Sequence, residues 1–287
     1  MKKLLTLALA LFMSLNLTGC SSSGNALERV KKQGYLVVGT SPDYAPNEFY
    51  IDDNGKKKMV GTDIALAQYI ADNLGVELRI QESDFNTVIA YAQAGIIDMG
   101  LSGFAWDEKR DEVVDFSIDF TRDYGDAWQG LMIRKEDADK YKVKEDIRKN
   151  NAKVGAQAAS IQYTMAKTIA DESNIVQLAD TTNVAAQLST GDLDAFVCTS
   201  TQAFALMETY DNIMILPEET FDLDPNDEFN RTGAIFSKDE GYDPLIEEVN
   251  KIIQKAKTPD ENGVILIDEW YREAQELMPF DLTDQLY

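Results

Sequence analysis

Short apolar runs alternate with longer amphipathic stretches over most of the chain. In the first half, apolar runs at 35–39, 77–81 and 97–101 are separated by segments in which apolar residues recur every three or four positions. The first pattern is typical of buried strands, and the second of helices that bury one face. Their alternation predicts an α/β fold with a mostly parallel sheet. The predicted helices of this half are 26–33, 63–74 and 86–94, and a hairpin is expected around 52–55.

The same alternation recurs in the second half, so we expect two α/β lobes. The predicted strands are 128–134, 153–156, 175–178, 194–198, 212–216 and 232–236. The predicted helices are 137–149, 160–171, 181–190 and 201–210, and two more that start at 243 and 261. A chain of 287 residues, of which 44% are hydrophobic, has enough apolar material for two cores.

The segment 97–117 places an apolar strand, a small-residue turn and the start of a charged helix in succession. Ser102 and Gly103 open the turn, Asp107 can cap the helix, and Arg110 lies in its first turn. Free backbone N–H groups beside a guanidinium would bind a carboxylate, which predicts a site for a small organic acid. The alternative is a solvated helix on which Arg110 pairs with a neighbouring aspartate.

The N-terminus has the layout of a secretory signal. Two lysines precede an apolar run over 4–17, which is short for a membrane span and stops before Cys20. The tetrapeptide that ends at Cys20 resembles the lipobox of bacterial lipoproteins, in which the signal is removed before a cysteine that then receives lipid. We therefore expect a signal peptide over 1–19, a tether and helix over 20–33, and an extracytoplasmic protein anchored to the bacterial cell membrane by lipid on Cys20. The alternative is a buried structural cysteine.

Composition excludes several classes of function. The chain has 27 basic and 50 acidic residues, a net charge of -23, so nucleic acid is not expected as a partner. It has no histidine, which excludes Ser-His-Asp and Cys-His nucleophilic systems and the usual zinc sites. The acidic turn 52–55 lacks the ligand spacing of a calcium-binding EF-hand loop. We expect no metal, no cofactor and no catalytic residues.

The segment that contains Arg110 resembles the corresponding segment of the polar amino-acid-binding proteins of ABC importers. In that family small hydroxyl residues, a Thr-x-x-Arg motif and a Val-x-Phe-Ser strand follow one another. The resemblance implies that Arg110 holds the α-carboxylate of the ligand and that Ser102, Gly103 and Ala105 line it. Asp107 stands where the family usually has threonine.

Two aromatic positions match the family as well. The stretch 39–46 resembles its first loop, and Asp84-Phe85 resembles its second aromatic position. The resemblance implies that Tyr44 and Phe85 cover the two faces of the ligand, the alternative being that either ring is part of a core. Ser41 stands where relatives that bind cationic side chains often have aspartate, so lysine, arginine and ornithine are the less expected ligands.

Two further motifs lie in the second half. The stretch 154–162 resembles the turn whose N–H groups reach the ligand carboxylate, which implies roles for Ser160 and Gln162; a simple helix cap by Ser160 is the alternative. The stretch 191–199 resembles the strand that ends, in the family, with an acidic residue that binds the ligand ammonium. Thr199 occupies that position here, so a neutral hydroxyl replaces the charge.

The resemblance covers nearly the whole mature chain and implies the two-lobed type II periplasmic-binding fold, with the ligand cleft between the lobes. Lobe one is expected over 34–126 and 232–287, and lobe two over 127–231. The chain would then cross between lobes near Asp126 and near Arg231.

The function implied is that of an extracytoplasmic, monomeric binding lipoprotein. It would capture an amino acid or a related small carboxylate and deliver it to the permease of an ABC transporter. Two alternatives stay open, namely a dehydratase-like lyase on the same scaffold and a module that reports ligand state to a membrane partner. Turnover of substrates would support the first, and signalling without uptake the second.

Overall fold

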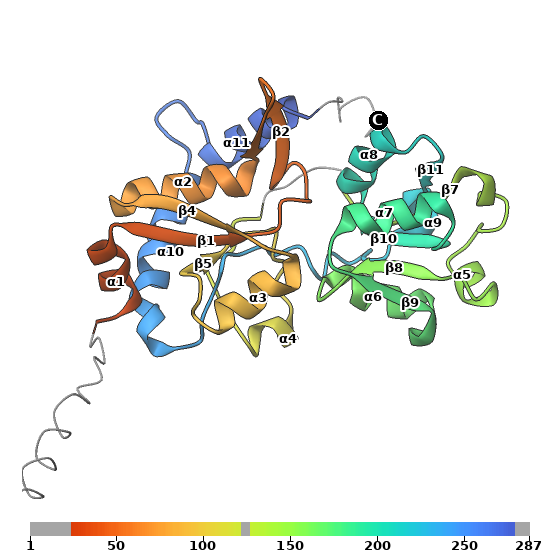
Figure 1. Ribbon diagram of the computed structural model, residues 1–287, viewed down its shortest axis with the longest axis horizontal. Coiled ribbons are helices and arrows are strands. Elements are labelled where there is room, and N and C mark those ends of the chain that lie inside the picture. Colours follow the sequence, from red (N-terminus) through yellow and green to blue (C-terminus); the bar gives the residue numbers. More distant parts are fainter. Residues whose placement is uncertain (1–23, 122–126, 279–287) are drawn as a thin grey trace, which may run out of the picture.

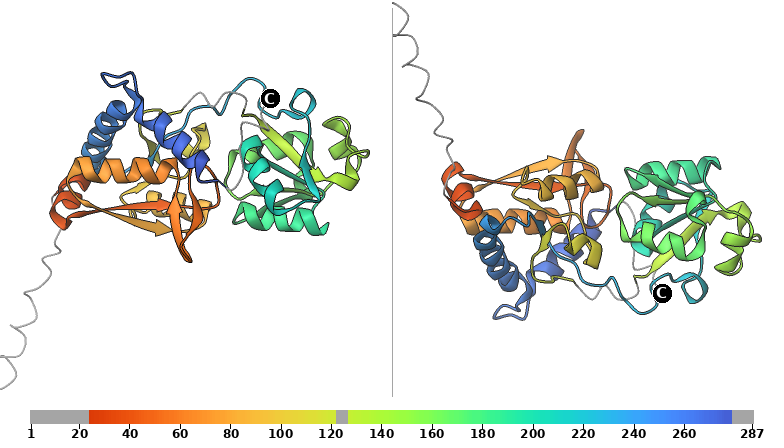
Figure 2. Two further views of the ribbon diagram at one scale, coloured as in Figure 1. Left: turned by 90° about the horizontal axis from the view of Figure 1, so that it is seen from above. Right: turned by 90° about the horizontal axis from the view of Figure 1, so that it is seen from below.

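The computed structural model describes residues 24–121 and 127–278, which form two lobes side by side (Figure 1). Each lobe contains one five-stranded sheet, and helices cover the sheets (Figure 2). The first sheet has the strand order β4-β1-β5-β12-β6, and the second has the order β11-β7-β10-β8-β9. The two-lobed α/β architecture expected from the sequence is confirmed.

The first sheet joins strands from both ends of the chain. Its strands are β1 (Tyr35–Thr40), β4 (Glu77–Glu82), β5 (Met99–Gly100), β6 (Asp115–Phe116) and β12 (Ile235–Phe236). β1 pairs in parallel with β4 and β5, whereas β12 runs antiparallel to β5 and β6. The chain therefore returns to the first sheet after it has built the second.

The helices of the first lobe begin and end at clear sequence signals. α1 (Ala26–Gln33) follows Asn25, whose side chain accepts an N–H of the first turn at 2.9 Å, and stops at Gly34 with φ 79°. α2 (Thr62–Leu74) stops in the same way at Gly75. The other helices are α3 (Phe85–Gln93), α4 (Glu108–Asp111), the short turn η3 (Glu240–Tyr242), α10 (Asp243–Lys257) and α11 (Leu266–Glu276).

A hairpin of β2 (Phe49–Asp53) and β3 (Lys56–Val60) projects from this lobe, as predicted. Asn54 and Gly55 connect the strands with φ values of 54° and 81°. Asparagine and glycine tolerate this left-handed conformation better than other residues, which explains why the reversal lies there.

The second lobe is built from the middle of the chain. Its strands are β7 (Gln129–Arg134), β8 (Val154–Gln157), β9 (Ile175–Leu178), β10 (Ala195–Thr199) and β11 (Ile213–Ile215). Its helices are η1 (Lys135–Asp137), α5 (Glu145–Lys149), α6 (Ile161–Ile169), η2 (Glu172–Asn174), α7 (Thr181–Thr190), α8 (Ser200–Thr209) and α9 (Glu218–Phe221).

The mostly parallel sheet expected from the sequence is confirmed, because four of the five strands in each sheet run in one direction. The reversed strands are β12 and β7, which follow the crossings between lobes and enter their sheets antiparallel to their neighbours. Two expectations about the helices are wrong. The helix predicted at 137–149 is only α5, since the Asp146 carboxylate accepts the N–H groups of residues 142–143 at 2.9 and 3.2 Å and holds them in a loop. The helix predicted from 261 begins at Leu266, because Asp260 holds a turn over 260–264 with its carboxylate.

The two lobes touch beside the cleft through an apolar cluster. Phe49 and Val60 of the hairpin contribute to it, together with Phe204 of α8 and Ala274 of α11. The packing of these side chains excludes water from this part of the contact between the lobes.

The crossing expected near Arg231 lies beside the first lobe, where the Trp106 N–H donates to the Arg231 carbonyl at 2.7 Å. The other crossing, near Asp126, lies outside the described residues, as do the signal peptide and Cys20. The lobe boundaries therefore stay a prediction. Over 24–121 and 127–278, no helix is long and apolar enough to cross a membrane.

Candidate functional site

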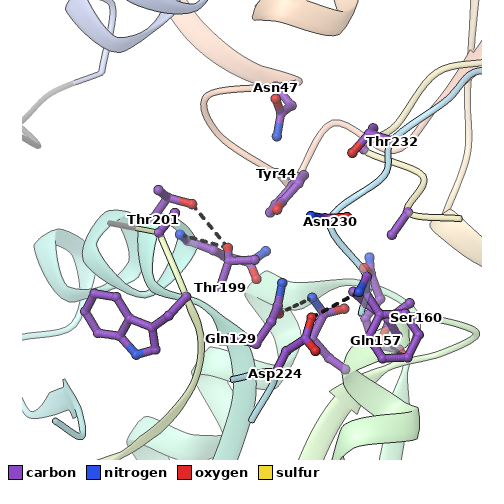
Figure 3. A pocket seen from close by; sticks show the side chains of 18 of the residues that line it. Tyr44, Asn47, Gln129, Gln157, Ser160, Thr199, Thr201, Asp224, Asn230 and Thr232 are labelled. Atoms are coloured by element: carbon purple, nitrogen blue, oxygen red, sulfur yellow. Dashed lines mark hydrogen bonds between the residues drawn. The ribbon is translucent and has the colours of Figure 1, made fainter. Parts of the chain in front are cut away.

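A cavity of about 840 Å³ lies between the lobes (Figure 3). Its wall is formed by loops of the first lobe, by the ends of β8 and β10 in the second lobe, and by the segment that crosses between them. All nine residues proposed from the sequence line this cavity: Tyr44, Phe85, Ser102, Gly103, Ala105, Arg110, Ser160, Gln162 and Thr199. Their roles in binding stay predictions.

Arg110 is buried, with 5% of its surface exposed. Its Nη1 donates to the Ala105 carbonyl, and its Nη2 donates across the cleft to the Ala159 carbonyl at 2.9 Å. Asp107 caps α4 and lies 3.8 Å from the guanidinium, so the pairing foreseen for a solvated helix exists, but within a buried site. Burial lowers the pKa of Arg110 to about 10, while Asp107 acts in the opposite direction. A buried guanidinium with one charged neighbour can still donate hydrogen bonds to a ligand carboxylate.

The Ser102–Gly103 turn differs from the expectation in one respect. Its N–H groups were expected to be free to bind an anion, but the Gly103 N–H already has a partner within the protein. The Gly103 N–H donates to the Asp63 carboxylate at 2.8 Å, and the Ser102 hydroxyl donates to Glu48 at 2.8 Å. Gly103 has φ 56°, and a Cβ there would lie 2.7 Å from the Tyr44 ring. The turn therefore offers a surface for close packing, and the binding of an anion at this wall stays a prediction for the Arg110 guanidinium.

The two aromatic residues differ in their surroundings. Phe85 is 8% exposed, and its ring lies 4.8 Å from that of Phe104, so most of it belongs to the core. Tyr44 lies over Gly103 and makes a side-chain hydrogen bond with Thr199 of the other lobe. Burial raises the pKa of Tyr44, so its hydroxyl is protonated and available as a donor.

On the second lobe, Ser160 and Thr199 each cap a helix. Ser160 accepts the Tyr163 N–H of α6 at 3.2 Å, and Thr199 accepts the Gln202 N–H of α8 at 3.3 Å. The capping role considered for Ser160 is therefore real, and both residues also face the cavity. Thr199 follows Cys198, which is fully buried in β10; burial raises the pKa of its thiol.

The turn before α6 contains a strained residue. Ala159 has φ 62°, a left-handed conformation that costs a residue with a Cβ roughly 1–2 kcal/mol. This conformation directs the Ala159 carbonyl to Arg110. Gln162, in the first turn of α6, donates to the Gln129 side chain at 2.9 Å, which fixes two carboxamides at the wall of the cavity.

Sequence reasoning missed Asp43, which joins the lobes. Its carboxylate accepts the Thr181 N–H at 2.8 Å, the Thr181 hydroxyl at 3.0 Å and the Gln157 side chain at 3.1 Å, all from the second lobe. Burial raises the pKa of Asp43, and the hydrogen bonds from Thr181 and Ser41 act against that shift. Asp43 lies within the 39–46 motif, but its partners are more than 100 residues away in the sequence, so no local signal identifies it.

The charged residues that line the cavity are mostly acidic. Two arginines, Arg110 and Arg231, face a larger set of acidic side chains. The acidic residues are Asp43, Glu48, Asp119, Asp222, Asp224, Asp227 and Glu218. This charge favours a ligand that carries a positive group as well as a carboxylate. Over the described part of the chain, no group of three or more His, Cys, Asp or Glu could hold a metal ion.

Comparison with known sequences and structures gives consistent results. The sequence family described as bacterial extracellular solute-binding proteins, family 3, matches residues 36–272. A probable histidine-binding protein of Campylobacter jejuni is 31% identical over 263 residues, which is 90% of this chain and 94% of that protein. The arginine-binding extracellular protein ArtP of Bacillus subtilis is 34% identical over 173 residues, 60% of this chain and 62% of ArtP, so the match spans less than two thirds of that relative.

A solved structure has the same architecture over its whole length. The substrate-binding protein AbpA of an amino acid ABC transporter from Streptococcus pneumoniae, bound to L-arginine, superposes with a TM-score of 0.75. It is 33% identical, and the match covers 88% of this chain and 100% of that one.

Proposed function

Because this chain belongs to the bacterial extracellular solute-binding proteins of family 3, we propose that it captures an amino acid or a related small carboxylate between its lobes and delivers it to the permease of an ABC importer. Membership of the family confirms the predicted two-lobed type II periplasmic-binding fold. The family is described as solute-binding, which supports a binding protein and not an enzyme.

One observation carries the proposal, namely that Arg110 of the first lobe and the turn before α6 of the second lobe meet across one cavity. The 2.9 Å contact between the Arg110 guanidinium and the Ala159 carbonyl brings the two lobes together at this point. A ligand carboxylate on Arg110 would lie beside residues of both lobes, so binding and closure of the cleft are coupled.

The charges of the cavity lining restrict the chemical class of the ligand. A carboxylate would bind Arg110, and an ammonium or another cationic group would lie toward the acidic part of the wall. L-arginine and L-histidine are the first ligands to test, because AbpA is bound to arginine and the Bacillus and Campylobacter relatives are named for these amino acids. This choice differs from the expectation based on Ser41, which made ligands with cationic side chains the less expected ones.

We further propose that lobe one comprises 34–126 and 232–287, that lobe two comprises 127–231, and that lipid on Cys20 anchors the protein outside the cytoplasm. The signal-like run before Cys20 supports the anchor, and the return of β12 to the first sheet supports the division into lobes. A monomer is sufficient, because one chain supplies both sides of the cavity.

The test is a thermal-shift screen of the mature protein against the L-amino acids and the corresponding carboxylates that lack the amino group. A ligand that binds only the folded state stabilises it by RT ln(1 + [L]/Kd), about 2.7 kcal/mol at a hundred times Kd. We expect at least one amino acid to raise the melting temperature. A screen in which no amino acid or carboxylate does so would refute the proposal.

A further inference from the structure

Two buried carboxyl groups lie beneath the Ser102–Gly103 turn. Glu48 is 0% exposed and Asp63 is 2% exposed. Glu48 ends the loop that starts at Tyr44, and Asp63 lies in the first turn of α2. The two side chains are joined by a hydrogen bond.

Each carboxyl holds one residue of the turn. Glu48 Oε1 accepts the Ser102 hydroxyl at 2.8 Å, and Asp63 Oδ2 accepts the Gly103 N–H at 2.8 Å. The Ser41 N–H completes the arrangement by donating to the Ser102 hydroxyl oxygen at 3.0 Å. The position of the turn therefore depends on both carboxyls at once.

The contact between the carboxyls requires a proton. Ionised carboxylates only accept hydrogen bonds, so two of them cannot bind each other unless one is protonated. Glu48 Oε2 is buried and has no donor within reach, which is what a protonated oxygen that itself donates would show.

The charged surroundings act in the same direction. Burial raises the pKa of Glu48 well above its ordinary value, and the negative charge of Asp63 raises it further. The hydrogen bond from Ser102 opposes this shift, and the charge of Asp43 adds a smaller rise. The Tyr44 phenol also faces Glu48 and stays neutral, since its own pKa is raised. The pair titrates as a unit, so the proton belongs to both groups.

We propose that Glu48 keeps its proton at neutral pH, that it donates a hydrogen bond to the Asp63 carboxylate through this proton, and that the pair positions the Ser102–Gly103 turn against the ligand. The second half rests on the proposed function, whereas the first half does not. Loss of the proton would place two negative charges under the turn and displace it. Glutamine at position 48 imitates the protonated form, because its amide accepts from Ser102 and donates to Asp63.

The proton is tested without any ligand by infrared spectroscopy at neutral pH. The wild-type protein should show the C=O stretching band of a buried protonated carboxyl, and Glu48→Gln should lack it. Asp63→Asn should lack it too, because the new amide can donate to an ionised Glu48. A wild-type spectrum without the band overturns the proposal, and so does a band that persists in Glu48→Gln.

The pH dependence of unfolding gives a second measurement. A raised folded-state pKa means that Glu48 contributes its full stability below the unfolded pKa of about 4.3 and loses it as the pH rises toward the folded value. The melting temperature of Glu48→Gln relative to wild type should therefore increase steadily from acid to alkaline pH. Parallel curves for the two proteins would contradict the shared proton.

Positioning is tested by the hydrogen exchange of the Gly103 amide. Glu48→Gln should keep its protection from exchange, and Glu48→Ala should lose it even though the protein remains folded, which the amides of β1 would report. Calorimetry with L-arginine then tests the consequence, since Glu48→Ala should bind about tenfold more weakly than Glu48→Gln. Equal protection in both variants overturns the positioning role, whereas failure of wild type to bind L-arginine concerns only the ligand of the proposed function.

Discussion

The guanidinium of Arg110 and the carbonyl of Ala159 are 49 residues apart in the sequence and 2.9 Å apart in space. This contact joins the helix start of one lobe to the helix start of the other. In the proposed function this side chain also holds the ligand carboxylate, so affinity and closure depend on the same atoms.

Arg110→Ala should abolish measurable binding of the amino acid identified in the screen. Removal of a buried, charge-assisted partner costs about 2–5 kcal/mol, which is enough to lose a micromolar ligand. Arg79→Ala is the matched control, because Arg79 lies on the outer strand β4 with 49% of its side chain exposed. Calorimetry measures both, and unchanged affinity in Arg110→Ala would mean that the carboxylate binds elsewhere.

Thr199→Asp should strengthen the binding of L-amino acids by about tenfold, or about 1.4 kcal/mol, and weaken that of the same carboxylates without the amino group. Aspartate is as good a helix cap as threonine, so α8 should keep its start. Thr199→Asn is the neutral control and should leave both affinities nearly unchanged. An equal effect of the aspartate on both ligand classes would show that no ammonium lies near position 199.

Asp43→Asn should weaken the hydrogen bonds between the lobes and shift the protein toward an open form. Hydrogen bonds to a charged group contribute about 1.5–3 kcal/mol, and Asp43 accepts several from Thr181 and Gln157. Small-angle scattering should give a larger radius of gyration than for wild type. Asp180→Asn is the control, since Asp180 caps the same helix α7 from within its own lobe; the idea fails if both variants scatter like wild type.

Ala159→Gly should stabilise the protein by a net value of about 0.5–1 kcal/mol, because glycine adopts φ 62° without the strain that alanine has there. The greater conformational entropy of the unfolded chain with glycine offsets part of this gain. Ala158→Gly, one position earlier and without a positive φ, should destabilise it. Denaturant unfolding measures both. The same sign in the two variants would show that the strain at 159 has no energetic weight.

Cys20→Ala should yield a folded protein that binds its ligand but is lost from the membrane fraction, because the proposed site of lipid attachment is gone. Cys198→Ala should remain on the membrane, since that cysteine lies in the core of the second lobe. Fractionation followed by immunoblotting compares the two. Retention of Cys20→Ala on the membrane would contradict lipid anchoring at this residue.

The sequence is informative where a site consists of neighbouring residues. The turn at Ser102 and the helix start at Arg110 are close in the chain, so their motif could be read as part of one cavity wall. The motif could not show that the Gly103 N–H, which was expected to bind an anion, donates instead to the carboxylate of Asp63, 40 residues earlier in the chain. That contact depends on how α2 packs against the turn, which no local pattern records.

Contacts between the lobes could not be predicted from the sequence either. Asp43 and Thr181 are 138 residues apart, and each looks like an ordinary polar residue in its own loop. The same holds for Glu48, one acidic residue among many until the fold buries it beside another. The predicted helix was too long where a side chain binds N–H groups that a longer helix would use. The Asp146 carboxylate does this by accepting the N–H of Lys142, which precedes α5.

The burial of Cys198 has a practical consequence for following the motion of the lobes. A thiol that is shielded from solvent and held in its neutral form does not react with maleimide dyes. If Cys20 is absent, cysteines introduced at the exposed positions Ile96 and Val143, one on each lobe, would be the reactive thiols of the chain. A donor and acceptor dye attached there would make single-molecule energy transfer a direct reading of cleft closure, with the native core left intact.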